Sequence, residues 1–200
     1  MSSQKFMKIV IVGDSRVGKT SLAYSYMNGT FNEDSPPTVF DNYNIHCSHG
    51  GDTYMLNIWD TAGGDEFYNL RTLTYTDVDV VVICYAINNR ESFKRVSCHW
   101  YPEIRHFLRT VPIILCATKM DTKRNGIDII RTDEARSLES KLKIHCFLET
   151  SSLTGSGVQK LFTTCIEAFL KPVNTPKKKR FFSHWKNYLA SVFRWNSSQF

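Results

Sequence analysis

The feature that most constrains this chain is a glycine-rich loop directly after a short apolar run. Residues 7–12 read MKIVIV, typical of a strand buried in a parallel sheet, and residues 13–20 then read GDSRVGKT. This order matches the phosphate-binding P-loop, G-x-x-x-x-G-K-[ST], in the strand-to-helix position that the motif requires. The pattern therefore predicts an α/β fold that binds a phosphate chain, and its context argues against a chance glycine turn.

Each part of this loop has a chemical reason. Gly13 and Gly18 allow a tight turn, so that backbone N–H groups wrap a phosphate chain, and the helix that begins near Gly18 adds the positive end of its dipole. Lys19 is expected to reach the β and γ phosphates, and the Thr20 hydroxyl to hold Mg²⁺. The expected phosphate-binding residues are Gly13, Asp14, Ser15, Arg16, Val17, Gly18, Lys19, Thr20 and Ser21.

Composition fits one folded domain with an appendage. The chain has 200 residues, of which 42% are hydrophobic, and no apolar run reaches the length of about 18 residues that spans a bilayer. The N-terminal MSSQK lacks the apolar core of a signal peptide, and Ser2 stands where N-myristoylation requires glycine. The six cysteines show no clustered spacing, which favours reduced thiols in a cytosolic chain.

Positive charge is concentrated near the C-terminal end of the sequence. The whole chain carries +6, while residues 171–200 hold seven basic and no acidic side chains, so the preceding part is close to neutral. This distribution argues against a body that binds nucleic acid and predicts a tail that meets an anionic surface.

Strands and helices are expected to alternate along the chain. The order predicts a P-loop α/β domain over residues 1–171, with a six-stranded, mostly parallel sheet, one antiparallel hairpin at Gly50-Gly51 and about five helices, followed by a basic aromatic tail over 172–200. A polar loop with two prolines is expected over 30–42, and Thr132 is the expected N-cap of its helix. Expected strands are 7–12, 43–49, 53–59, 78–86, 112–118 and 144–148; expected helices are 18–27, 66–74, 92–108, 132–142 and 157–170.

Two further segments are expected at the phosphate end. In Asp60-Thr61-Ala62-Gly63, Asp60 would orient a Mg²⁺-bound water and the Gly63 N–H would bond a γ-phosphate. Thr38, in the loop after two prolines, would ligate Mg²⁺ when a γ-phosphate is present. Both loops would then be held by one phosphate and released when it is lost.

Two more segments predict a guanine pocket. In Thr118-Lys119-Met120-Asp121, the Asp121 carboxylate would accept two N–H bonds from guanine, a donor pair that adenine lacks, and the Lys119 stem would cover the base. In Glu149-Thr150-Ser151-Ser152-Leu153, Ser151 would brace this loop and the Ser152 N–H would bond the guanine O6. Five motifs in this order, each beside an expected strand, argue against coincidence.

From about residue 6 to 170 the chain resembles the Ras superfamily of small GTPases. Within it, residues 37–43 (PTVFDNY), 58–63 (IWDTAG) and 100–106 (WYPEIRH) are most similar to the Rho family. The resemblance implies binding of GDP and GTP with Mg²⁺, an aromatic beside the base at Phe31, a monomeric state and exchange-factor partners. It also implies that effector proteins bind through switch I, at Val39, Phe40, Asp41 and Tyr43.

The sequence departs from the family pattern at two positions beside the water that would attack the γ-phosphate. Gly64 stands where the family has a water-orienting glutamine, and Ser15 stands where it has a P-loop glycine. The residues that the resemblance assigns to catalysis are Lys19, Thr38, Gly63 and Gly64. We expect slow or GAP-insensitive hydrolysis; the alternative is neutral drift with another water-positioning group, although one-residue shifts to Asp65 or Glu66 rarely restore catalytic geometry.

Two other departures concern the surface. Ser35 replaces a tyrosine of switch I, which predicts faster nucleotide exchange, and the 121–151 interval is too short for the extra helix typical of Rho proteins. The chain therefore resembles a divergent, atypical member, either similar to the Chp/Wrch branch or Rac-like.

The tail is expected to replace a lipid anchor. The last cysteine is Cys165, so we expect no C-terminal prenylation, and instead a basic run is followed by aromatic residues within one helical arc. This pattern predicts peripheral binding to an anionic membrane; the alternatives are docking on the body of the protein and a nuclear-localisation-like run. The expected membrane residues are Lys177, Lys178, Lys179, Arg180, Phe181, Trp185, Tyr188, Phe193 and Trp195.

Together these features predict a Rho-like GTP-binding switch in signalling, cytoskeletal or polarity control, or membrane traffic. It would be cytoplasmic, with peripheral association to a cytoplasmic membrane face. The first alternative is a pseudo-GTPase binding module whose nucleotide never turns over. The second, a P-loop nucleotide kinase, is disfavoured because residues 118–121 and 149–153 fix guanine rather than a phosphate acceptor.

Overall fold

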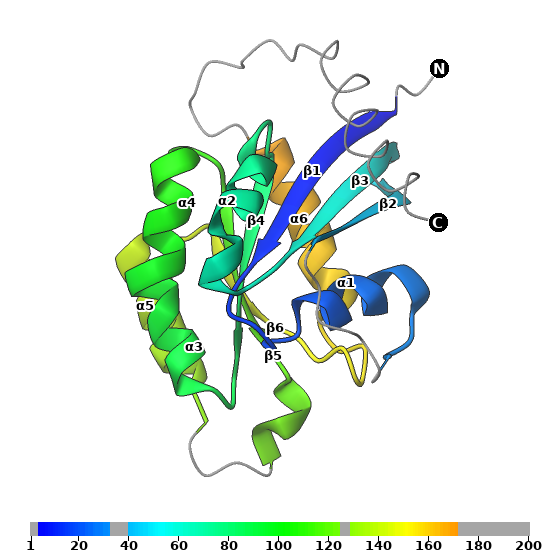
Figure 1. Cartoon of the computed structure of the whole chain (residues 1–200). Coiled ribbons are helices and arrows are strands. Elements are labelled where there is room, and N and C mark those ends of the chain that lie inside the picture. The colour runs from blue at the N-terminus through cyan, green and yellow to red at the C-terminus, as the bar shows by residue number, and fades with distance from the viewer. Residues whose placement is uncertain (1–3, 33–39, 125–128, 172–200) are drawn as a thin grey trace, which may run out of the picture.

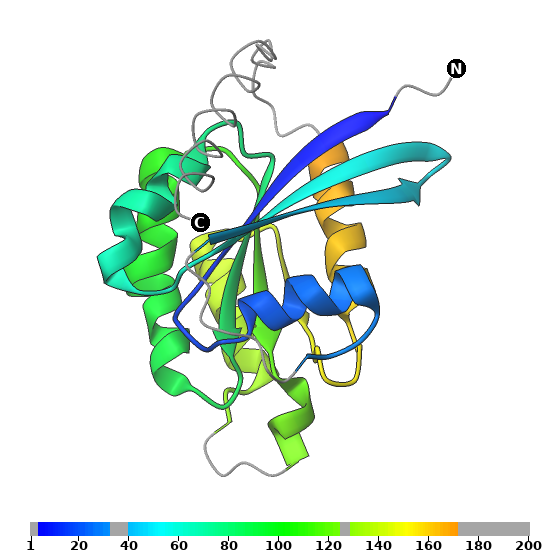
Figure 2. The ribbon, with the colours of Figure 1, turned by 45° about the vertical axis from the view of Figure 1, so that its right-hand side comes forward.

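The computed structural model describes residues 4–32, 40–124 and 129–171. Their six strands form one sheet in the order β2-β3-β1-β4-β5-β6, in which only the β2–β3 pair is antiparallel. This confirms the expected fold class; Figure 2 shows the antiparallel hairpin beside β1. The strands are β1 (Lys5–Val12), β2 (Phe40–His49), β3 (Asp52–Thr61), β4 (Val80–Ala86), β5 (Ile113–Thr118) and β6 (Cys146–Glu149).

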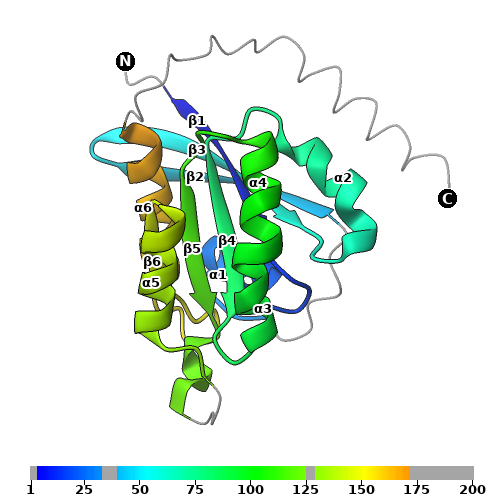
Figure 3. The same cartoon turned by 90° about the vertical axis from the view of Figure 1, so that its left-hand side faces the viewer.

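Helices cover both faces of the sheet. Helices α1 and α6 lie on one side and α2 to α5 on the other (Figures 1 and 3). Because a π-helical turn over Val96–Trp100 joins α3 to α4 without a break, the described segments form five helices apart from short 3-10 turns. The helices are α1 (Lys19–Asn28), α2 (Tyr68–Thr72), α3 (Arg90–Arg95), α4 (Tyr101–Phe107), α5 (Thr132–Leu142) and α6 (Val158–Leu170).

The core has two parts, separated by the sheet. Successive strand residues point to opposite faces, so Ile9 and Ile11 of β1 pack with α1 and α6, whereas Val10 and Val12 pack with Trp100 beneath α3 and α4. Residues 80–86 of β4 divide in the same way and are all buried. A strand that is buried on both faces must be apolar throughout, which is why the continuous apolar runs predicted the central strands well.

Two boundaries differ from expectation. Strand β2 begins at Phe40, inside the expected loop, because residues 40–42 continue the antiparallel ladder with Trp59 to Thr61. The expected Thr132 N-cap is wrong: Thr132 is the first helical residue, and the backbone N–H of Arg131 donates to Glu134 at 3.0 Å. The Thr132 hydroxyl instead donates to Glu149 at 2.6 Å, so a tertiary contact replaces the local cap.

The expected helix over 92–108 contains Pro102, and the structure accommodates it with the π-helical turn that ends just before it. Proline has no N–H, and its ring crowds the carbonyl four residues earlier. Widening the preceding turn relieves that crowding without ending the helix. The continuous segment runs from Arg90 to Phe107.

The loops that carry the motifs lie at the carboxyl ends of the parallel strands. The P-loop follows β1, residues 62–64 follow β3, residues 119–121 follow β5 and residues 150–153 follow β6. In an open α/β sheet this edge is the ligand-binding edge. No helix among the described segments is long and apolar enough to cross a membrane.

Candidate nucleotide-binding site

The P-loop glycines are required by the backbone. Gly13 has φ of 144° and Gly18 φ of 98°, both in the region that favours glycine. A Cβ at Gly13 would collide with the backbone oxygen of Cys84, so the loop can lie against β4 only without a side chain there. Val17 is buried, and its carbonyl accepts a hydrogen bond from the Thr118 hydroxyl. This bond ties the P-loop to the end of β5.

Lys19 lies across this loop. Its Nζ donates to the backbone oxygens of Gly13 and Asp14, both at 2.8 Å, and the side chain is 6% exposed. Burial lowers the pKa of Lys19 below its usual value, with the nearby Asp60 carboxylate opposing that shift. The two carbonyl dipoles stabilise the positive charge of Lys19 only in part. A phosphate chain bound in the loop would supply a fully charged anionic partner.

The expected magnesium ligands meet beside Lys19. The Thr20 hydroxyl donates to Asp60 Oδ2 at 2.5 Å, and Asp60 is fully buried at the end of β3. A hydroxyl and a carboxylate are hard oxygen ligands, and Mg²⁺ in phosphate sites takes one or two such protein groups plus phosphates and waters. These residues fit Mg²⁺; the third expected ligand, Thr38, lies outside the described residues.

At the other end of the site, the expected base-binding residues are brought together. Ser151 Oγ donates to Asp121 Oδ1 at 2.5 Å, so the serine links the two loops and holds the carboxylate. Lys119 has φ of 62° and its Nζ donates to the Arg16 carbonyl at 2.8 Å, which stretches its stem along the pocket. Thr118 is buried and anchors the P-loop, a structural role that the sequence did not suggest.

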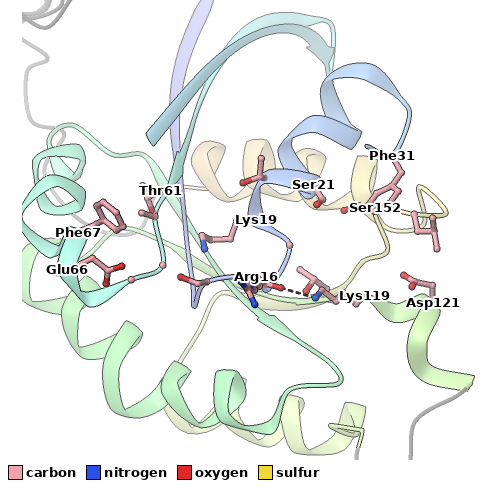
Figure 4. A pocket seen from close by; sticks show the side chains of 18 residues that line it. Arg16, Lys19, Ser21, Phe31, Thr61, Glu66, Phe67, Lys119, Asp121 and Ser152 are labelled. Atoms are coloured by element: carbon pink, nitrogen blue, oxygen red, sulfur yellow. Dashed lines mark hydrogen bonds between the residues drawn. The ribbon is translucent and has the colours of Figure 1, made fainter. Parts of the chain in front are cut away.

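These residues line one pocket of about 600 Å³. Figure 4 shows Lys19 toward one end of it and Asp121 at the other, with Phe31 and Ser152 also beside the base end. Five of the residues described above are not among those that line the pocket: Gly13, Asp14, Val17, Asp60 and Ser151. The lining is Ser15, Arg16, Gly18, Lys19, Thr20, Ser21, Phe31, Thr61, Ala62, Gly63, Gly64, Glu66, Phe67, Thr118, Lys119, Asp121, Ser152 and Leu153.

The glycines after β3 differ in what surrounds them. A Cβ at Gly63 would overlap the backbone of Asp14 and Ser15, so this residue packs directly on the P-loop. The atoms nearest to a Cβ at Gly64 are those of the Glu66 carboxylate, which it would overlap, and Gly64 has an ordinary extended backbone with φ of −76°. Gly63 is thus needed for close approach, whereas Gly64 leaves a space that another side chain occupies.

Sequence reasoning missed an arginine that links the P-loop to the segment after β3. Arg95 of α3 bonds Asp14 and Asp65, both at 2.8 Å, and the Trp100 indole N–H donates to the same Asp14 oxygen at 2.7 Å. A hydrogen bond from Arg95 lowers the pKa of Asp65. The sequence did contain a signal for this contact, because Arg95 lies five positions before Trp100 within one expected helix.

A second missed arginine holds the same segment from inside. Arg71 is buried, forms a two-pronged ion pair with Glu103 at 2.9 Å, and donates to the backbone oxygens of Ala62 and Gly64 at 3.1 Å. The Tyr75 hydroxyl donates to Glu103 at 2.5 Å. A buried ion pair that is fully hydrogen-bonded costs several kcal/mol to break on one side, so this segment is anchored.

The expected effector residues lie at or near the start of β2. Asp41 is exposed and Tyr43 is half-buried, and the Tyr43 hydroxyl donates to Asp41 at 3.4 Å. Burial raises the pKa of Tyr43 to about 12. Phe40 begins the strand, while Val39 lies outside the described residues, as do all the expected membrane residues from Lys177 to Trp195.

Comparison with known proteins agrees with this geometry. The family model described as "Ras family" matches residues 8–171. The Ras-like GTP-binding protein RHO1 of Entamoeba histolytica is 36% identical over 176 residues, which cover 88% of this chain and 82% of that protein.

Proposed function

The chain belongs to the Ras family, and we propose that within it this protein is a Rho-like GTP-binding switch whose own hydrolysis is slow. The observation that carries the proposal is the pairing of a complete base end, where Ser151 orients Asp121 at 2.5 Å, with a phosphate end in which Gly64 contributes no side chain. Tight nucleotide binding and slow turnover favour a long-lived GTP state.

The switch follows from the two loops around the γ-phosphate position. Lys19, Thr20 and Asp60 would hold the phosphates and Mg²⁺, which supplies charge neutralisation when bound. The Gly63 N–H would bond a γ-phosphate, and Thr38 would approach from the other loop. Loss of the γ-phosphate would release both, and effectors that bind Phe40, Asp41 and Tyr43 would sense the release.

A turnover experiment tests this proposal against its alternative. The protein is loaded with trace-labelled GTP in excess Mg²⁺, and bound GDP and released phosphate are measured over hours. Slow conversion, with micromolar or tighter binding of GTP and GDP and none of ATP, supports a switch. Permanently bound, unconverted GTP would instead identify a pseudo-GTPase module, and equal affinity for ATP would remove the guanine assignment.

We also propose that residues 172–200 form a tail that attaches the domain of residues 1–171 to the cytoplasmic face of a membrane. The tail has the basic run Lys177 to Arg180 and aromatic side chains at Phe181, Trp185 and Tyr188. Each basic residue near an anionic surface contributes about 1 kcal/mol before screening, and aromatic burial adds roughly 25 cal/mol per Å². Neither contribution alone gives firm attachment at physiological salt, whereas the two together do.

The tail proposal is tested with liposomes and in cells. The full chain is expected to bind anionic vesicles more strongly than neutral ones, with affinity falling as salt rises. A chain ending at Thr175 should be cytosolic, and Trp185→Ser with Tyr188→Ser should release most of the protein. Membrane association that persists in the shortened chain would place the anchor elsewhere.

A further inference from the structure

Glu66 lies where a side chain at position 64 would be. Its carboxylate occupies the space that a Cβ on Gly64 would need, and both residues line the pocket. Figure 4 shows Glu66 on the same side of the pocket as Thr61 and Phe67, with Lys19 between this group and Asp121. Among the described residues of the lining, Glu66 and Asp121 are the acids, and Glu66 is the one on the side of Lys19 away from the base end.

The backbone that presents Glu66 is held on both sides. The Phe67 N–H donates to the Gly64 carbonyl at 3.2 Å, closing the 3-10 turn that carries Glu66 back over Gly64. Arg71 bonds the Gly64 carbonyl at 3.1 Å from the core, and Arg95 bonds Asp65 at 2.8 Å from α3. The backbone that carries Glu66 is therefore fixed by buried and bridging contacts, while its side chain is exposed.

We propose that Glu66 is a catalytic residue, whose carboxylate accepts a hydrogen bond from the water that attacks the γ-phosphate. This inference rests on the proposed function, since it requires bound GTP. The water oxygen forms a bond to the γ-phosphorus while the bond from that phosphorus to the β–γ bridging oxygen breaks, and GDP leaves with the electron pair. One proton of the water passes directly to an oxygen of the released phosphate, while Glu66 holds the water in place by accepting a hydrogen bond from its other O–H.

The same assignment accounts for slow rather than fast hydrolysis. A glutamine amide accepts from water and also donates to a phosphate oxygen, whereas a carboxylate has only acceptors. Its negative charge also repels the γ-phosphate at short range. Gly64 is then a matched partner of Glu66, because any side chain at position 64 would displace the carboxylate.

Single-turnover hydrolysis of preloaded GTP tests the role. Glu66→Ala is expected to lower the rate constant about tenfold or more, because orienting an attacking group contributes at least that much. Glu66→Gln keeps an acceptor oxygen and should stay within about threefold of wild type. Neither variant should weaken GTP binding more than about twofold. Glu91→Ala, which removes an exposed acid on α3, serves as the control and should match wild type.

The outcomes separate this inference from the proposed function. If Glu66→Ala hydrolyses GTP as fast as wild type, Glu66 has no catalytic role although the switch remains. If wild-type protein binds GTP but never converts it, both the role and slow hydrolysis are wrong. If Glu66→Ala loses rate only in proportion to GTP affinity, the residue acts in binding and the inference is overturned.

Discussion

The two ends of the pocket are built differently. At the base end, side chains from the carboxyl ends of β5 and β6 meet one another, as in the 2.5 Å bond between Ser151 and Asp121. At the phosphate end, the P-loop and residues 62–64 meet through backbone, and Gly63 leaves no room for a Cβ. We therefore expect specificity at the base end to depend on side-chain chemistry, and hydrolysis at the phosphate end to depend on which small residues leave space.

The two ends of the pocket also differ in the solvent exposure of some residues that support them. Thr118 and Ser151, which support the base end, are buried, as are Lys19 and Asp60 at the phosphate end. Asp65 and Glu66 are exposed, and their segment is fixed by two arginines instead. A change at the base end should therefore alter affinity, whereas a change at the phosphate end should alter rate and switching.

Asp121→Ala should have the largest effect, at the base end. Losing charge-assisted bonds to a buried base costs on the order of 1.5–3 kcal/mol each, so GTP and GDP affinity should fall by more than about tenfold. Titration with fluorescent nucleotides measures the change. Asp133→Ala, an exposed acid at the start of α5, is the control. Unchanged guanine affinity in Asp121→Ala would refute the base-end assignment.

At the phosphate end, Gly63→Ala and Gly64→Ala form a matched pair. The methyl group at Gly63 meets immovable backbone of Asp14 and Ser15, and overpacking of this kind costs about 1–3 kcal/mol. The nearest atoms to a methyl group at Gly64 belong to the flexible end of Glu66, which can turn aside. Thermal unfolding with and without GTP should show a lower midpoint for Gly63→Ala only. Equal destabilisation by both would show that close approach is not specific to Gly63.

Two substitutions at the phosphate end should raise the rate of GTP hydrolysis. Ser15→Gly with Gly64→Gln supplies a water-orienting amide and removes the side chain that crowds it, so turnover should rise, by about tenfold at an assumed barrier change of 1.4 kcal/mol. Because Glu66 occupies the space beside Gly64, adding Glu66→Ala to this pair should raise the rate further. Wild-type turnover equal to that of the double variant would disprove the argument from these two positions.

Sequence patterns predicted the sheet well because its central strands are buried on both faces. The continuous apolar run at residues 7–12 has few alternatives, and the glycines of the P-loop leave a recognisable spacing. Helix ends were less predictable, since the Thr132 hydroxyl is used by Glu149 across the fold. Nothing in the sequence around Thr132 indicates that Glu149 is its hydrogen-bond partner.

The residues of the candidate site likewise fall into those that the sequence predicted and those that it missed. Motif residues such as Lys19 and Asp121 are found by spacing, because each is proposed to contact a ligand of fixed shape. Arg95 was missed because its partners, Asp14 and Asp65, lie 81 and 30 residues away in sequence. Glu66 was set aside because a one-residue shift seldom restores geometry, and only the folded turn shows that its carboxylate returns over Gly64.

Ser151→Ala should have the smallest effect and tests whether the base end is one unit. Removing the hydroxyl deletes its bond to Asp121. A neutral side-chain donor to a charged acceptor contributes at most about 1.5 kcal/mol here, because Asp121 itself remains, so guanine affinity should fall by about tenfold or less. In the Asp121→Ala background the same change should have almost no effect, because Ser151 acts through Asp121. Ser156→Ala, at an exposed serine of the same loop, is the control. Additive losses in the double variant would mean that Ser151 contributes on its own, and the base end would then be a set of separate contacts.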